Sequence, residues 1–76
     1  MTPKPLKNNM KVYRAMNDWT QEELARRVNV TRKTINTVEN GKYAPSVYLA
    51  LKIARAFGVP VEELFQIDDD GIADSA

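Results

Sequence analysis

Cationic, amide and hydroxyl side chains crowd the segment 31–42, where large apolar residues are few. The polar residues expected to be exposed are Arg32, Lys33, Asn36, Thr37 and Asn40. Ile35 and Val38 are the only large apolar residues of this segment, so a helix here would bury one narrow stripe and leave a broad polar face in water. Such a face can bind phosphates and the acceptor edges of bases, or it can be an ordinary solvated surface.

Two helix starts frame this segment. Thr20 is a good N-cap, and Glu23 three residues later predicts a capping box. The same pattern begins again at Thr31, and each start has an apolar pair at the spacing of a hydrophobic staple. The dipeptide 29–30 leaves room for only a tight connection, which predicts two short helices crossing steeply as a helix-turn-helix. This arrangement favours a polar face that recognises the DNA major groove over one that is only an ordinary solvated surface.

The rest of the chain predicts a helical scaffold. We expect further helices over about 9–17, over 46–57 with Gly58 ending the helix, and over 61–65 after Pro60. The segments 5–7 and 65–67 could pair as a short two-stranded ribbon. The predicted fold class is therefore all-α, with five helices and possibly a short terminal β-ribbon. Its parts are an N-terminal arm over 1–8, a domain over 9–67 and an acidic tail over 68–76.

Composition narrows the function classes. The 76 residues suit one domain, and the chain has no cysteine and no histidine. Disulfides, zinc-finger ligand sets and nucleophile-histidine catalysis are thereby excluded. No apolar run approaches about 18 residues, and the first residues lack the core of a signal peptide. We expect a cytoplasmic protein that is not an enzyme, with no cofactor, no metal, no membrane contact and no identifiable small-molecule ligand.

Charge is unevenly distributed along the chain. Residues 1–59 hold all eleven Lys and Arg against four acidic residues, a balance of +7. Residues 60–76 hold six acidic residues and no basic one, a balance of −6. A basic pole facing phosphates and an acidic pole facing away would suit DNA binding, although an acidic tail can also serve solubility alone.

The motifs resemble those of one family. T-Q-E-E-L-A opens the first helix of the pair, V-T-R-K-T-I-N leads into the second, and E-N-G-K-Y-x-P-S follows it. In this order they resemble the phage-repressor and Cro type of helix-turn-helix regulator, the Xre family, with similarity from about residue 9 through 66. The resemblance implies a lambda-repressor-like DNA-binding domain.

The resemblance also implies roles for individual residues. Those expected at base edges are Thr31, Arg32, Lys33 and Thr37. Those expected on DNA phosphates are Gln21, Asn40, Lys42 and Tyr43. Arg14 and Glu39 are expected to form a structural ion pair. Two alternatives stay open, because Arg32 and Lys33 could be solubilising charge and Tyr43 could pack over the edge of the core.

The end of the domain carries more apolar surface than a small core can enclose. The residues concerned are Leu51, Val61, Leu64, Phe65 and Ile67. Together with the resemblance they predict a homodimer on an inverted-repeat operator, although they could instead cover one another within a monomer. The expected function is double-stranded DNA binding as a homodimeric transcriptional regulator, a repressor. The alternatives are an antitoxin-type regulator that also binds a partner protein, and a protein-interaction module that does not bind DNA.

Overall fold

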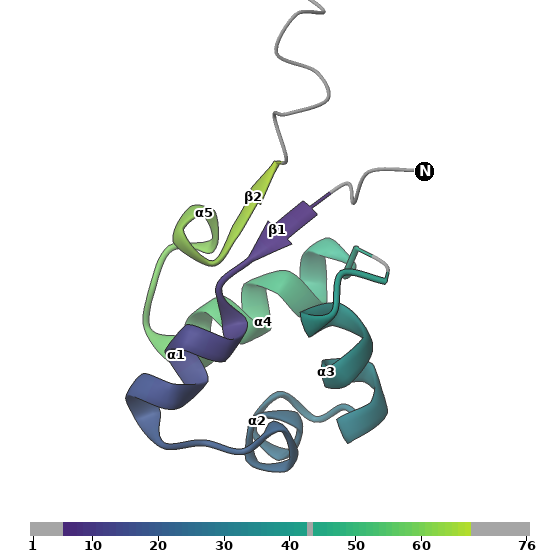
Figure 1. The fold of residues 1–76 in the computed structure, drawn as a ribbon, viewed down its shortest axis with the longest axis vertical. Coiled ribbons are helices and arrows are strands. Elements are labelled where there is room, and N and C mark those ends of the chain that lie inside the picture. Colours follow the sequence, from purple (N-terminus) through teal and green to yellow (C-terminus); the bar gives the residue numbers. More distant parts are fainter. Residues whose placement is uncertain (1–5, 43, 68–76) are drawn as a thin grey trace, which may run out of the picture.

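The computed structural model describes residues 6–42 and 44–67 and shows a helical domain with a small ribbon (Figure 1). The elements are β1 (Leu6–Asn8), α1 (Met10–Asn17), α2 (Gln21–Val28), α3 (Arg32–Glu39), α4 (Val47–Phe57), α5 (Val61–Leu64) and β2 (Phe65–Ile67). The predicted fold class is confirmed, including the ribbon. Tyr43 and the predicted acidic tail lie outside the described residues.

Three helices begin at side-chain caps, and the sequence predicts two of these caps, at Thr20 and Thr31, and a helix start at Ser46. The pairs are Thr20 Oγ1 with the N–H of Glu23 at 3.0 Å, Thr31 Oγ1 with that of Thr34 at 3.2 Å, and Ser46 Oγ with that of Leu49 at 3.1 Å. Each hydroxyl accepts from a backbone N–H that the first helical turn cannot satisfy. The caps therefore set the starting residues of α2, α3 and α4.

The prediction of a complete capping box at α2 is wrong in one respect. Among the described residues, the carboxylate of Glu23 accepts from Arg26 and Arg27 rather than from the backbone N–H of Thr20. The competing partners are guanidinium groups three and four residues along the same helix, and charge-assisted hydrogen bonds are stronger than those to a neutral amide. Half of the box thus forms, and the other half is replaced by ion pairs.

A sharp turn joins α2 to α3. Asn29 adopts the left-handed conformation, with φ 60° and ψ 47°, and ends α2. The N–H of Val30 then donates to the carbonyl of Ala25 at 3.0 Å, which closes the helix end. Only three residues separate the two helices, so α3 leaves α2 at a steep angle (Figure 1). This is the helix-turn-helix arrangement predicted from the sequence.

The core lies where α4 packs behind α2 and α3. Its buried residues are Met10, Leu24, Ala25, Val28, Ile35, Val38, Leu49, Ile53, Ala54 and Leu64. Trp19 stacks on Phe57 at 5.3 Å between ring centroids, and Tyr13 packs on the same ring at 5.6 Å. From α3 only Ile35, Val38 and the charged Glu39 are buried, which leaves the rest of that helix at the surface.

The ribbon pairs the two ends of the described chain. β1 and β2 are antiparallel, with Leu6 opposite Ile67 and Asn8 opposite Phe65. Asn8 Nδ2 also donates to the carbonyls of Val38 and Glu39, each at 3.2 Å. The strand that begins at Leu6 therefore lies within the folded unit and holds the last turn of α3, although the sequence places it in the arm.

Candidate nucleic-acid interface

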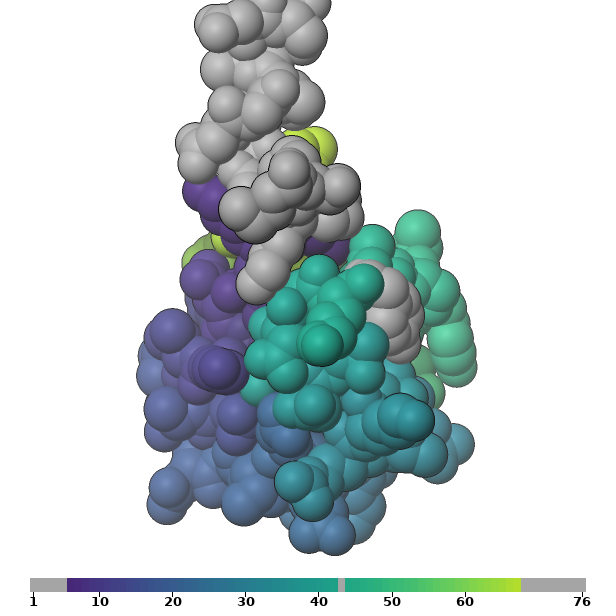
Figure 2. Space-filling model, turned by 45° about the vertical axis from the view of Figure 1, so that its right-hand side comes forward, coloured from purple at the N-terminus to yellow at the C-terminus, as the bar shows by residue number. Residues whose placement is uncertain are grey.

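The outer face of α3 carries cations that pair with no acidic group in the described part of the chain. Figure 2 shows α3 and its exit, in teal, at the front of the molecule, with α2 in blue below it. Arg32 and Lys33 are exposed at the start of α3, and neither side chain makes a hydrogen bond or ion pair within residues 6–42 and 44–67. Cations that are exposed and have no internal partner are available to bind an external anion.

Two other cations of the helix pair are engaged. Arg26 Nη2 lies 2.6 Å and Arg27 Nε lies 2.7 Å from Glu23 Oε2. The hydrogen bond from Arg26 lowers the pKa of Glu23, and the same bond raises the pKa of Arg26. The guanidinium of Arg27 also lies 4.1 Å from the ring centroid of Trp19. Unpaired positive charge on the helix pair is therefore concentrated at α3 rather than on α2.

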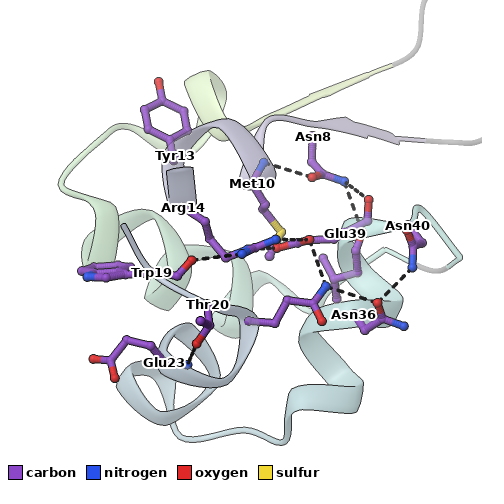
Figure 3. A network of polar contacts seen from close by, with 12 residues as sticks. Asn8, Met10, Tyr13, Arg14, Trp19, Thr20, Glu23, Asn36, Glu39 and Asn40 are labelled. Carbon is purple, nitrogen blue, oxygen red and sulfur yellow. Dashed lines mark hydrogen bonds and ion pairs between the residues drawn. The ribbon is translucent and has the colours of Figure 1, made fainter. Parts of the chain in front are cut away.

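A bidentate ion pair anchors α3 to α1. Arg14 Nε lies 2.5 Å from Glu39 Oε2, and Arg14 Nη2 donates to Glu39 Oε1 at 3.1 Å (Figure 3). Arg14 Nη1 also donates to the carbonyl of Trp19 at 3.0 Å. The Glu39 side chain has 0% exposure and that of Arg14 has 18%. The structure thus brings together the two residues expected to pair, and their fork geometry fixes the orientation of the last turn of α3.

Gln21 lies at the first position of α2, but its side-chain amide is already bonded within the protein. Nε2 donates to Asn36 Oδ1 at 3.2 Å and to Glu39 Oε1 at 3.1 Å. A DNA phosphate is ionised at neutral pH and can only accept hydrogen bonds. It therefore cannot bond to the Gln21 carbonyl oxygen, which is also only an acceptor. A contact between this amide and a phosphate would therefore require one of the two internal bonds to be exchanged.

The two threonines expected at base edges both have hydroxyls that are bonded within the protein. Thr31 is exposed, but its hydroxyl is the cap of α3 and also lies 3.0 Å from Thr34 Oγ1. Thr37 Oγ1 donates to the carbonyl of Lys33 at 2.8 Å. In both residues the hydroxyl has an internal task, and the methyl group is what remains for a base.

The segment after α3 is held by backbone hydrogen bonds. Gly41 has φ 70°, and the N–H of Lys42 donates to the carbonyl of Thr37 at 3.1 Å, as in a Schellman motif. Asn40 Nδ2 donates to Asn36 Oδ1 at 3.2 Å, and the side chain of Lys42 is exposed. The expected phosphate residue Tyr43 lies outside the described residues.

The residues expected at a dimer interface divide into three groups. Leu51 and Ile67 are exposed, by 54% and 64%. Val61 and Phe65 are partly buried against the core. Leu64 has 0% exposure and belongs to the buried core, so its assignment to an interface is wrong. A shallow hollow beside Leu51 is lined by Gly58, Val59, Pro60 and Val61 among others.

Two asparagines near the site were not predicted to act there. Asn8 bonds to the end of α3 across 30 residues of sequence, and Asn36 accepts from both Gln21 and Asn40. Helical periodicity places Asn36 on the exposed face of α3 but gives no sign of its partners. A signal for Asn8 was absent, because its partners are backbone carbonyls that any residue possesses.

Within the described residues, no helix has the length and apolar character to cross a membrane.

Comparisons with known proteins agree with this geometry. A family model described as helix-turn-helix matches residues 10–64. An HTH-type transcriptional regulator of Methanocaldococcus jannaschii is 51% identical over 65 residues, which cover 86% of this chain and 98% of the relative. Antitoxin HipB of Escherichia coli is 36% identical over 55 residues, which cover 72% of this chain and 58% of HipB.

Solved structures show the same fold. The crystal structure of the hypothetical transcription factor NHTF from Neisseria matches with a TM-score of 0.69 and 33% identity, covering 72% of this chain and 62% of that one. The solution structure of the SOS-response transcriptional repressor LexA from Eubacterium rectale matches with a TM-score of 0.70 and 28% identity, covering 84% and 66%. The chain therefore belongs to the helix-turn-helix family of transcriptional regulators, of the Xre type.

Proposed function

We propose that the protein binds double-stranded DNA sequence-specifically, as a homodimeric transcriptional repressor that inserts α3 into the major groove. The observation that carries the proposal is the outer face of α3. Its first two residues, Arg32 and Lys33, are exposed and unpaired among the described residues, while the opposite face is fixed to the core and to Arg14. A rigid helix with unpaired cations at its N-terminal end has the form that helix-turn-helix proteins use to read base edges.

Base reading is assigned to the first turns of α3. Arg32 and Lys33 suit the O6 and N7 acceptors of guanine, for which these side chains are the commonest partners. Thr31 and Thr37 offer methyl groups to thymine, because their hydroxyls are bonded within the protein. In this proposal α3 supplies both polar and apolar contacts to the groove.

Phosphate binding is assigned to the flanks of α3. Lys42 extends from the Schellman turn, and Asn40 and Gln21 lie on either side of Asn36. Gln21 also begins α2, where unsatisfied backbone N–H groups and the helix dipole favour an anion. We assign the phosphate contact at this position to these N–H groups and to the Gln21 amide, which exchanges its bond to Glu39 and keeps its bond to Asn36. Tyr43 keeps the phosphate role that the sequence suggests, outside the described residues.

The test is selection of binding sites from a pool of random duplexes, followed by titration of the selected and a scrambled duplex at two salt concentrations. We expect at least about 10³-fold tighter binding of the selected duplex, and affinity that falls as salt rises. Arg32→Ala and Lys33→Ala should each lose about 1 to 3 kcal/mol on the selected duplex. Lys52→Ala, which removes the same charge from α4, is the matched control. Failure to enrich any sequence would refute sequence-specific recognition.

The antitoxin-type alternative is favoured by one comparison and one surface. HipB, the E. coli relative described above, is named an antitoxin. On α4, Val47 and Tyr48 are exposed by 76% and 73%, outside the residues proposed for the dimer. A second protein that co-purifies at fixed stoichiometry with the wild type, and is lost with Tyr48→Asp, would support this alternative.

A further inference from the structure

The hydrogen bonds below α3 fix which way a chain of side-chain amides must point. The Glu39 carboxylate can only accept hydrogen bonds, and Arg14 can only donate them. Gln21 also reaches Glu39 Oε1, so it must present its NH₂ group there and not its carbonyl. The buried charge of Glu39 thus permits only one orientation of the Gln21 amide.

The same NH₂ group transmits this orientation to α3. Gln21 Nε2 donates a second hydrogen bond to Asn36 Oδ1, and Asn40 Nδ2 donates to that oxygen as well. Both lone pairs of the Asn36 carbonyl are therefore occupied. Asn36 Nδ2, on the other side of the amide, makes no hydrogen bond within the part of the chain that the structure describes.

Asn36 is placed where such a donor can reach a ligand of α3. The residue is exposed, and it lines a surface hollow together with Arg32 and Lys33. Figure 3 shows Asn36 and Asn40 at the edge of the network, joined by a hydrogen bond. The hollow therefore presents only hydrogen-bond donors from these three side chains: a guanidinium, an ammonium and one amide NH₂.

We propose that Asn36 is a specificity-determining residue that contacts one base edge through Nδ2 alone, as a hydrogen-bond donor. This proposal rests on the proposed DNA binding. An asparagine that reads adenine needs its carbonyl for N6 and its NH₂ for N7, and here the carbonyl is committed to Gln21 and Asn40. Guanine, with two acceptors at N7 and O6, and thymine, with O4, satisfy a donor alone, whereas adenine offers N7 beside the competing N6 donor and cytosine offers only a donor. The position read by Asn36 therefore favours guanine or thymine, accepts adenine less well and disfavours cytosine most.

In this proposal Gln21 is a positioning residue. It sets the amide of Asn36 without itself touching the base. Gln21→Met keeps the length of the side chain and removes the link to Glu39. Asn36 and Asn40 could then reverse together, with Asn36 Nδ2 donating to Asn40 Oδ1 and the Asn36 carbonyl turned outward. Reversal would raise the preference for adenine at the same base position, because the carbonyl can then accept from N6.

The experiment is site selection from random duplexes with the wild type, Asn36→Ala and Gln21→Met, with thermal melts to check folding. Asn17→Ala, which removes an exposed amide from α1, is the matched control. We expect Asn36→Ala to lose base preference at one position per half-site, by about 5- to 100-fold, and to keep the rest of the profile. Gln21→Met should bind all duplexes more weakly and tolerate adenine at that same position better than the wild type does.

Three results would overturn the proposal. An Asn36→Ala profile identical to that of the wild type would show that Asn36 reads no base, while the proposed DNA binding would stand. A Gln21→Met profile in which adenine is no better tolerated than in the wild type would show that the amide chain does not set the preference. A wild type that binds no duplex would overturn both this inference and the proposed function.

Discussion

At the scale of single residues, the pair of Arg14 and Glu39 is the one whose disruption should cost the most folding stability. The Glu39 side chain is fully buried, and its carboxylate also accepts from Gln21. A complete buried pair can add little net stability, because desolvation offsets the attraction, but removal of one partner leaves an unpaired charge. The pair is therefore better understood as a device that orients α3 than as a source of stability.

Glu39→Gln should consequently destabilise the domain more than its small change of shape suggests. We expect a loss of about 3 to 5 kcal/mol in the free energy of unfolding for full desolvation, and less to the extent that water reaches Arg14. Urea titrations of Glu39→Gln, Arg14→Met and the double variant give the coupling. The double variant should lose less than the two single losses combined. Strict additivity would show that the pair does not act as a unit.

Lys42 tests the distinction between phosphate and base contacts. Its side chain is exposed beyond the end of α3, where the Schellman turn holds its backbone. Lys42→Ala should weaken binding to all duplexes alike and reduce the slope of log affinity against log salt by about one. Titrations of a selected and a scrambled duplex over a salt series measure both effects. A shift in base preference without a change of slope would place Lys42 at a base instead.

At the scale of the elements, local signals could be predicted and partners across the fold could not. Thr20 and Thr31 cap their helices as their sequence context predicts, because each cap needs only the next three residues. Whether Leu64 closes the core or lies at an interface depends on how α5 packs on distant helices, which periodicity over four residues cannot decide. Asn8 was likewise beyond prediction, since its partners lie 30 residues away.

The candidate site shows the same division. The exposure of Arg32 and Lys33 follows from the narrow apolar stripe of α3, which the sequence displays directly. The internal bonds of Gln21 do not follow from any local pattern, because Asn36 and Glu39 approach it only after α2 and α3 have crossed. A ligand-binding role that requires a side chain without internal hydrogen bonds can therefore be assigned only once the structure is known.

The helix ends offer a test of backbone strain. Gly58 ends α4 with φ 72°, and a Cβ added there would meet nothing within 4 Å. Gly58→Ala should therefore cost about 1 kcal/mol in the free energy of unfolding through its backbone conformation alone. Asn29→Gly at the end of α2, where φ is 60°, should not destabilise, because glycine adopts this conformation freely. Urea midpoints measure both, and equal losses in the two variants would contradict this account.

At the scale of the whole molecule, the proposed DNA contacts and the proposed dimer contacts lie on different elements. Within the helix pair, the unpaired cations are those of α3, and the acidic residues of the expected tail follow β2 in the sequence. Exposed Leu51 and Ile67 lie on α4 and β2 rather than on α3. A dimer formed through α4 and β2 would leave both copies of α3 free for one DNA molecule. The proposed division is an arm over 1–8, a domain over 9–67 and a tail over 68–76. The strand β1 belongs to the arm by its position in the sequence and to the domain by its pairing with β2.

The proposed dimer yields the final prediction. Leu51→Asp should convert a dimer into a monomer, because it places a charge in an apolar interface. Val12→Asp on α1 is the matched control, since Val12 is exposed by 56% and Leu51 by 54%. Sedimentation at micromolar concentration should show a dimer for the wild type and the control, and a monomer for Leu51→Asp.

The operator must then reflect the symmetry of the protein. Two copies of α3 related by a two-fold axis read half-sites about one DNA turn apart, roughly 34 Å, in an inverted repeat. Footprinting should show both half-sites protected by the wild type. Leu51→Asp should lose most of this affinity while each half-site keeps its base preference, because a monomer retains α3 but gives up the second set of contacts. A wild type that sediments as a monomer and protects a single unrepeated half-site would refute both the interface and the operator geometry.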